Sequence, residues 1–293
     1  MFAIIGKNRF KTALIVTLIF AFLCAVIYFV SYALGIDPYS AAMFAIGFSM
    51  LTSIGSYWFS DKIVLRLSNA HPATPEQERY LTDILGRLVT AAGITMPRLY
   101  VMHDSSPNAF ATGRNHKNGV ICVTTGLLES LDYNQTEGVL AHELAHIKNC
   151  DILLQTVASV MIGAAIMMAN MFSRSMIYGS RGRRSSSRGG KGQIVVVLVG
   201  LFFAILAPIA GQLLRLSLSR NREYLADATA IEFTRDPEGL ASALEKISGS
   251  RIPLQNVNTA MEGMYIASPS TIKNLFSTHP PIEKRVSAIR NMR

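Results

Sequence analysis

Two histidines and a glutamate in the middle of the chain have the spacing of a metal-dependent hydrolase. They lie within residues 139–148 as His142, Glu143 and His146. Residues four apart share one face of an α-helix, so both imidazoles can bind a single metal ion. Glu143 lies beside them, where its carboxylate can take a proton from metal-bound water as general base. Imidazole suits Zn²⁺, and a catalytic site keeps one position open for water. The pattern predicts one catalytic zinc ion per chain.

The residues around this motif favour a packed metal site over a chance occurrence. The chain has only six histidines in 293 residues, so random composition gives the pattern in well under about 1% of such chains. The flanking residues are apolar or small, which suits a buried helix: Val139, Leu140, Ala141, Leu144, Ala145 and Ile147.

A third protein ligand is expected because catalytic zinc takes three. Among the acids after the motif, Glu223 is preferred because Asp227 follows it on the same helix face. Glu223 can bind the metal while Asp227 accepts the spare N–H of a ligand histidine. The alternative is an exposed acidic pair flanked by Arg220 and Arg222, although Tyr224 and the alanines nearby favour packing.

The composition is that of a membrane protein. Half of the residues (50%) are hydrophobic and 16% are charged, whereas charged residues make up about a quarter of a soluble domain. Four stretches without charged side chains are each near the roughly 20 residues that cross a bilayer core: 12–34, 41–59, 152–172 and 194–214. We therefore predict a mainly α membrane protein with four hydrophobic helices and a small α+β zincin-like metalloprotease domain.

Other whole-chain features fit this class. The first apolar stretch is longer than a signal-peptide core, so it is expected to remain as an anchor. The three cysteines, Cys24, Cys122 and Cys150, lack Cys-x-x-Cys spacing, so neither a disulfide framework nor a thiolate zinc site is indicated. The net charge of +9 comes without a nucleic-acid motif, so we expect no nucleic-acid partner. Anionic lipid headgroups of the bilayer explain the charge more simply.

The charges also suggest an order of domains. Basic residues before the first stretch place the N-terminus in the cytoplasm. Residues 1–60 then form a transmembrane hairpin, and 61–151 hold the first, cytoplasmic part of the catalytic domain with the zinc helix. Residues 152–214 form a second hydrophobic hairpin, and 215–293 hold the helical second part of the catalytic domain with the third ligand.

The loop at 173–193 conflicts with this topology. It carries arginines and a lysine but no acid, so it opposes the positive-inside bias if it lies outside the cell. Either the loop is translocated, or the hairpin at 152–214 does not fully cross the membrane. The loop itself is a flexible linker or a headgroup-binding segment.

Local signals predict the elements that position the motif. Thr74 followed by Pro75 caps a helix that reaches about Ala92, before Gly93. Strand formers mark 98–102 and 120–124, with a third short strand at 108–113 joined to the next by a hairpin turn. Asn134 is the expected cap of the metal-binding helix, which reaches Asn149, and further helices are expected from 215, at 237–247 and at 281–292.

Four segments taken together resemble the HtpX-type integral membrane zinc proteases, gluzincins related to the CAAX prenyl endopeptidases. They are 142–146, 221–227, 108–113 and the sequence Thr278-His279-Pro280-Pro281. The resemblance covers essentially the whole chain and implies His142, His146 and Glu223 as zinc ligands and Glu143 as catalytic base. It also implies an endopeptidase of the bacterial inner membrane that faces the cytoplasm and removes misfolded or damaged membrane proteins under stress.

The resemblance further implies a substrate-binding edge strand beside the cleft. A peptide added to it as an extended strand would gain main-chain hydrogen bonds whatever its sequence. The strand comprises Asn108, Ala109, Phe110, Ala111, Thr112 and Gly113. His279 could donate a hydrogen bond to the developing oxyanion. The alternatives are an ordinary hairpin strand and a histidine that merely precedes a helix.

Two other functions stay open. The chain could be a zinc-binding membrane scaffold without turnover, although such a scaffold has no use for Glu143. It could also be a protease of lipid-modified peptides, since the metal helix lies close to an apolar stretch. The sequence leaves the oligomeric state open.

Overall fold

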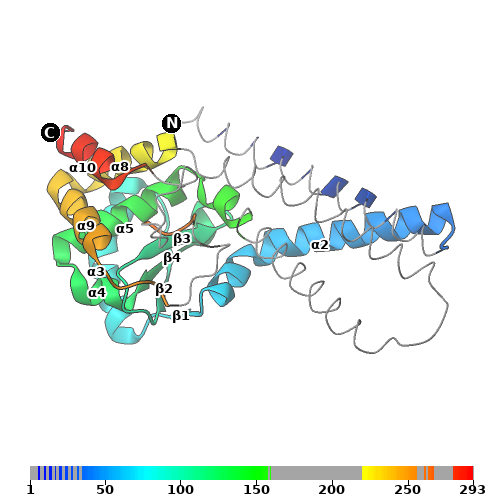
Figure 1. The fold of residues 1–293 in the computed structure, drawn as a ribbon, viewed down its shortest axis with the longest axis horizontal. Helices are drawn as coiled ribbons and strands as arrows, with labels where there is room; N and C mark the ends of the chain where they lie inside the picture. Colours follow the sequence, from blue (N-terminus) through cyan, green and yellow to red (C-terminus); the bar gives the residue numbers. More distant parts are fainter. Residues whose placement is uncertain are drawn as a thin grey trace, which may run out of the picture.

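The computed structural model describes residues 35–157, 159, 220–255, 261, 263–266 and 280–292, with scattered positions before residue 35. A long helix projects from a body that holds a small sheet and the remaining helices (Figure 1). The helices are α2 (Pro38–Leu67), α3 (Pro75–Ala92), α4 (Thr125–Ser130), α5 (Tyr133–Lys148), α8 (Arg220–Thr234), α9 (Pro237–Gly249) and α10 (Ile282–Arg290), with a 3₁₀ turn, η1 (His116–Asn118). The strands are β1 (Ala70–Pro72), β2 (Arg98–Met102), β3 (Ala109–Gly113) and β4 (Gly119–Thr124).

Helix α3 has the predicted start and end. Thr74 and Gln77 form a capping box, in which each side chain accepts a hydrogen bond from the other's backbone N–H. Gly93 ends the helix in the left-handed conformation, with φ of 66°, which glycine adopts without strain. The expected helices at 237–247 and 281–292 are also present as α9 and α10, and α8 covers the described part of the helix expected from 215.

Helix α5 begins earlier than predicted. Asp132, not Asn134, is its cap, so the prediction of Asn134 is wrong. The carboxylate of Asp132 accepts from the N–H of Gln135, whose side chain accepts in return from the N–H of Asp132. This reciprocal pair satisfies two backbone donors, whereas Asn134 lies inside the first turn.

The sheet has the strand order β1-β2-β4-β3. Strands β2 and β4 are parallel, and the two outer pairs are antiparallel. The predicted strands at 98–102, 120–124 and 108–113 are confirmed within one residue, and β3 and β4 form the predicted hairpin. Because β3 pairs with β4 alone among the described strands, it lies at the edge of the sheet.

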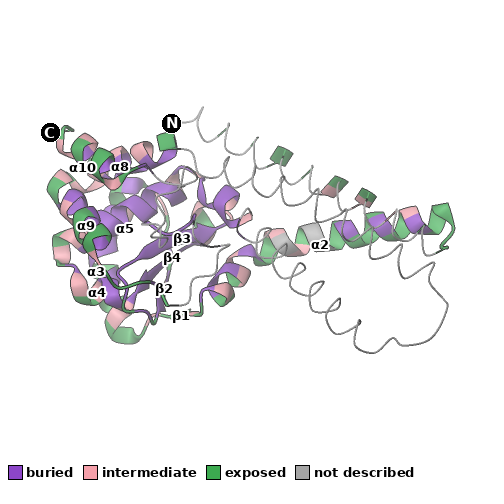
Figure 2. Ribbon diagram, in the orientation of Figure 1, coloured by how far each residue is buried: buried purple, intermediate pink, exposed green. Residues whose placement is uncertain are grey.

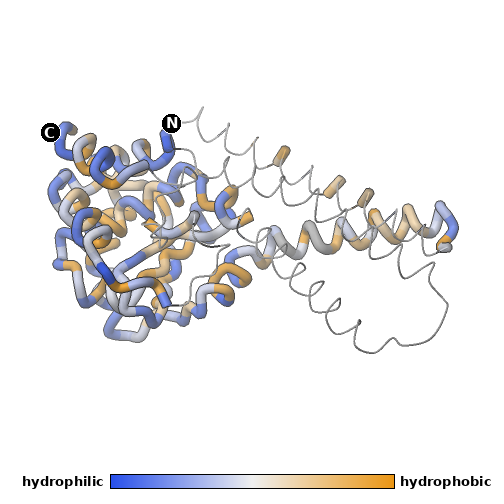
Figure 3. Tube along the Cα trace, in the orientation of Figure 1, coloured by the Kyte–Doolittle hydropathy of each residue, from blue (hydrophilic) through white to orange (hydrophobic). Residues whose placement is uncertain are grey.

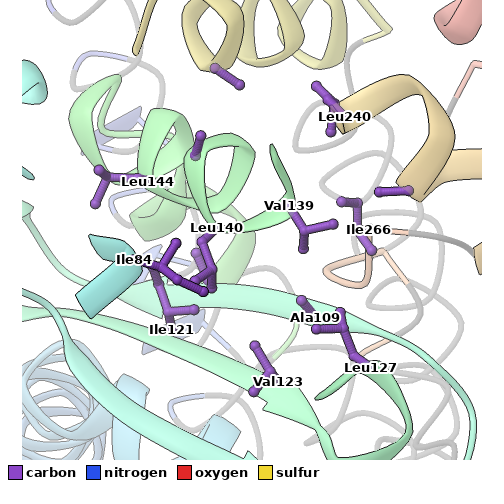
Figure 4. Close-up of a cluster of buried hydrophobic side chains, with 14 of the residues drawn as sticks. Ile84, Ala109, Ile121, Val123, Leu127, Val139, Leu140, Leu144, Leu240 and Ile266 are labelled. Atoms are coloured by element: carbon purple, nitrogen blue, oxygen red, sulfur yellow. The ribbon is translucent and has the colours of Figure 1, made fainter. Parts of the chain in front are cut away.

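Alternation along the strands divides the core into two clusters. Side chains of one set face α3, α5 and α9 (Figure 4); from the strands they are Leu99, Val101, Ala109, Ala111, Ile121 and Val123. The intervening residues face the opposite cluster beside α2, which includes Val64, Met102, Phe110, Cys122 and Tyr265. Strands covered on both faces have few polar residues, and β3 and β4 are buried throughout.

Helix α2 contains the predicted apolar stretch 41–59 and carries large exposed hydrophobic side chains along its length (Figures 2 and 3). Within the described part of the chain, none of the helices is long and apolar enough to cross a membrane. The stretch 194–214 and the loop 173–193 lie outside the described residues, as does most of 12–34 and 152–172. Four hydrophobic helices therefore stay a prediction.

Candidate metal centre

Helix α5 brings the motif into the interior, between the sheet and helices α8 and α9. The side chains of His142, Glu143 and His146 are all buried. Close packing at Gly138 allows this, because a Cβ there would lie 2.7 Å from the backbone nitrogen of Leu240. A glycine at this point lets α5 approach the start of α9 and keeps the motif out of solvent.

The two predicted histidines and Glu223 converge at one point. The Nε2 atoms of His142 and His146 lie 3.2 Å apart. From α8, the carboxylate oxygens of Glu223 lie 3.7 Å from each of these nitrogens. All three residues are buried, and their possible ligand atoms lie within 4.8 Å of one another. The exposed acidic pair, the alternative for Glu223 and Asp227, is therefore wrong.

The donor set fits Zn²⁺. Two nitrogens at roughly 2.05 Å from a tetrahedral zinc ion are separated by about 3.3 Å, close to the observed 3.2 Å. The distance from each nitrogen to Glu223 is only a few tenths of an ångström longer than that geometry requires. Two imidazoles and one carboxylate also match the ligands of catalytic rather than structural zinc sites.

Asp227 orients His142, as predicted for a residue behind the ligands. Its carboxylate lies 2.9 Å from Nδ1 of His142, which leaves Nε2 directed at the centre. Arg285 of α10 holds the same carboxylate with two hydrogen bonds, Nε to Oδ2 at 2.9 Å and Nη2 to Oδ1 at 2.6 Å. We call His142, Asp227 and Arg285 the Asp227 bridge. Its three side chains are at most 1% exposed.

Asp151 is placed in the same way on the second histidine. Its Oδ2 lies 3.4 Å from Nδ1 of His146, and its Oδ1 lies 3.9 Å from Nη1 of Arg222 on α8. We call His146, Asp151 and Arg222 the Asp151 bridge. The sequence analysis missed Asp151 and Arg285. An acid five residues after His146 is a signal that could have found Asp151, whereas an arginine on the apolar face of 281–292 indicates burial of Arg285 but not its partner.

The two histidines differ in their electrostatic surroundings. Burial lowers the pKa of His142, and the positive charge of Arg285 lowers it further against the opposing effect of Asp227. Burial acts in the same direction on His146, but the carboxylates of Asp151, Glu223 and Glu143 outweigh it and raise its pKa to about 9. The site thus combines one imidazole beside a cation with one surrounded by anions.

Glu143 lies between the metal ligands and the edge strand. The backbone of Ala111 in β3 lies close enough to its carboxylate to favour the charged form slightly. Burial, supported by the charge of Glu223, raises the pKa of Glu143 in the protein alone to about 7, although His146 and Arg285 oppose this. A pKa near the working pH suits a group that takes and returns a proton.

The predicted edge strand contacts the site along its outer side. The carbonyl oxygen of Asn108 faces β4, where it accepts from Thr124; by alternation, Ala109, Ala111 and Gly113 turn their backbone groups outward. Phe110 packs against Tyr265 in the opposite cluster, and Thr112 hydrogen-bonds Thr156. His279 lies outside the described residues, so its proposed oxyanion contact stays a prediction.

Comparison with known proteins identifies the family. The model of peptidase family M48 matches residues 75–293, which include helices α5 and α8. The chain belongs to peptidase family M48. A Protease HtpX homolog from Dictyoglomus thermophilum is 44% identical, covering 98% of this chain and 93% of the relative. Another from Caldanaerobacter subterraneus is 41% identical, covering 98% and 96%. The chain is thus a metalloprotease, and the resemblance to the HtpX-type proteases is confirmed.

Among solved structures, one described as the crystal structure of S. mikatae Ste24p matches this chain. It is 18% identical with a TM-score of 0.49, and the match covers 97% of this chain but 66% of that chain.

Proposed function

We propose that this M48 peptidase is a membrane-bound zinc endopeptidase that hydrolyses peptide bonds in misfolded or damaged membrane proteins. The observation that carries the proposal is the position of Glu143, which is buried and directly follows His142 where His142, His146 and Glu223 converge. A site that only stores zinc has no use for a carboxylate at this point.

The ligands and Glu143 have separate tasks. His142, His146 and Glu223 would hold Zn²⁺, which supplies Lewis-acid activation of water and of the scissile carbonyl when bound. The carboxylate of Glu143 takes a proton from the attacking water and carries it to the leaving amine. Burial, which raises the pKa of Glu143 in the metal-free protein, makes this carboxylate a better proton acceptor. The reaction needs no covalent intermediate with the protein.

A substrate that bound as an added strand would pair with β3 at Ala111, because the outward groups on either side already have partners. On one side of Ala111, the carbonyl of Ala109 already accepts from the N–H of Ile266 at 2.9 Å. On the other side, the N–H of Gly113 lies 3.4 Å from Oγ1 of Thr156. Ala111, which lies between these two contacts, is close to the carboxylate of Glu143. Main-chain pairing there would accept many sequences, as degradation of damaged proteins requires.

A membrane location rests on the apolar stretches of the sequence and on α2. Exposed side chains of α2 include Met43, Phe44, Leu51, Ile54 and Trp58, an apolar surface that lipid would cover. Basic residues before the first stretch favour a catalytic domain in the cytoplasm, and the resemblance to the HtpX-type proteases favours the bacterial inner membrane. Protection of a C-terminal tag from protease in sealed cells, and its loss in inverted vesicles, would test this orientation.

The full chain in detergent tests the enzymatic proposal. Zinc content and cleavage of casein would be measured for the wild type and for Glu143→Gln, which keeps the shape of the side chain but removes the base. We expect about one zinc per chain in both proteins and cleavage by the wild type alone, at a rate at least about 10²-fold higher.

Other outcomes contradict the proposal in distinguishable ways. A wild type that binds no zinc would refute the metal centre. Zinc in both proteins without cleavage of unfolded, membrane or lipid-modified substrates would favour the scaffold function. Cleavage of lipid-modified peptides alone would change the substrate class and keep the enzyme.

A further inference from the structure

Two contacts join Asp151 to His146 at the C-terminal end of α5, one through the backbone and one between the side chains. Helix α5 is followed by Asn149 as C-cap and then by Cys150, whose φ of 57° is left-handed. The N–H of Asp151 donates to the carbonyl of His146 at 3.1 Å, and that of Cys150 donates to Ile147 at 3.2 Å. This pair of hydrogen bonds is a Schellman motif. The motif turns the chain back so that the Asp151 carboxylate also reaches the His146 ring.

The carboxylate of Asp151 contacts residues of both ligand-bearing helices. It lies 3.4 Å from Nδ1 of His146 on α5 and 3.9 Å from Nη1 of Arg222 on α8. Arg222 directly precedes the ligand Glu223. Asp151 is fully buried, and Arg222 is 9% exposed, so water screens this ion pair poorly. The contact joins the two sides of the metal centre where the chain leaves α5 and enters α8.

We propose that Asp151 is a positioning residue that fixes the ring of His146 for metal binding, and that Arg222 fixes Asp151. An imidazole whose Nδ1–H is held by a carboxylate presents Nε2 to the metal in a defined direction. The Asp151 bridge therefore does for His146 what the Asp227 bridge does for His142. It also joins the end of α5 to the start of α8, the two helices that carry the proposed ligands.

The inference rests on the zinc site of the proposed function, and its test measures metal binding rather than cleavage. The full chain in detergent would be stripped of metal, and its zinc affinity would be determined by competition with a chromogenic chelator. We expect Asp151→Asn to weaken zinc binding by about 10- to 100-fold. In the Co²⁺-substituted protein we expect its visible absorption bands to shift, because these bands report the ligand geometry.

A matched control separates positioning from a general loss of structure. Asp104 is also buried, at 5% exposure, and accepts hydrogen bonds from the backbone of Ser106 and Gln255. Asp104→Asn should lower the unfolding temperature but leave the zinc affinity and the Co²⁺ spectrum unchanged. Asp151→Glu should restore part of the affinity, because it restores the carboxylate.

Arg222 gives an independent measurement. Arg222→Gln should weaken zinc binding by only about fivefold, because Arg222 contacts Asp151 and not His146 itself. The double variant Asp151→Asn/Arg222→Gln should be no worse than Asp151→Asn alone, because Arg222 acts through Asp151. Losses that multiply in the double variant would show that the two residues act separately and would overturn the bridge.

The remaining outcomes also decide the question. Wild-type zinc affinity and an unchanged Co²⁺ spectrum in folded Asp151→Asn would overturn the role of Asp151. If Asp151→Asn does not fold, Arg222→Gln decides: weaker binding supports the proposal, and unchanged binding overturns it. A wild type that binds no zinc would instead refute the proposed function itself, so the two failures are distinguishable.

Discussion

The Asp227 bridge and the Asp151 bridge hold the two ligand histidines with the same chemistry but different geometry. In the Asp227 bridge the carboxylate lies 2.9 Å from His142 and 2.6 Å from Arg285. In the Asp151 bridge the corresponding distances are 3.4 Å to His146 and 3.9 Å to Arg222.

The two bridges also differ in how the fold assembles them. Asp151 follows His146 by five residues, and a local turn delivers it. Asp227 and Arg285 come from α8 and α10, so the first bridge forms only after three helices have packed together. We infer that the ring orientation of His142 depends on the packing of other helices, whereas the ring orientation of His146 is set in part by the end of its own helix.

The largest effect should come from removing the central carboxylate of the Asp227 bridge. Asp227→Ala leaves Arg285, which is fully buried, without its closest counter-charge, and should destabilise the zinc-free protein by about 3–5 kcal/mol. Asp151→Ala should cost about 1–3 kcal/mol, because Arg222 is less buried and more distant. Denaturant unfolding of both variants in detergent measures the difference. Equal losses would contradict the comparison.

A second, smaller difference should appear when only the shape of the arginine changes. Arg285→Lys keeps the charge but loses the two-pronged contact with Asp227, which a lysine cannot make. We expect a loss of about 2 kcal/mol in stability and weaker zinc binding. Arg290→Lys is the control, because Arg290 lies on the same helix and binds Glu238 and Glu245 at the surface. Stability equal to that of the control would show that the buried contact is unimportant.

The sequence predicted which side chains share a helix face, but it did not predict most of the contacts in the two bridges. Helix periodicity predicted that His142 and His146 share one face and that Glu223 and Asp227 share another. The meeting of these two faces was expected from the need of catalytic zinc for a third ligand and from the family resemblance, not from periodicity. The strand at 108–113 was predicted from the hairpin turn that follows it, and its place at the edge of the sheet from the family resemblance. The local predictions depend on patterns that span only a few residues.

Arg285 could not be assigned in this way. It lies 58 residues from Asp227, and no local rule says which helix packs over the site. The turn at Cys150 was hidden for a different reason, because glycine usually occupies the left-handed position of a Schellman motif. The cap of α5 was misplaced because Asp132 and Asn134 are both good caps and each has a possible capping-box partner three residues later, Gln135 or Glu137, so the sequence does not decide between them.

Acid should weaken the Asp227 bridge by a smaller amount. Burial alone would raise the pKa of Asp227, but Arg285 and His142 outweigh it and hold the pKa below its usual value. A lowered folded pKa stabilises the protein above the unfolded value of about 3.9, and this contribution is lost as the pH falls through the folded pKa. The stability difference between zinc-free wild type and Asp227→Asn should therefore shrink below about pH 4. A constant difference down to pH 2.5 would contradict a charged Asp227.

The smallest effect should follow Arg222→Lys. The single contact of Arg222 with Asp151 spans 3.9 Å, so a lysine can supply the same charge without losing a two-pronged hydrogen bond. We expect the zinc affinity to change by less than about twofold, in contrast to the loss in Arg285→Lys. Chelator competition on the two variants side by side measures this. If Arg222→Lys weakened zinc binding as much as Arg285→Lys, the Asp151 bridge would depend on shape as well as charge, and the distinction between the two bridges would fail.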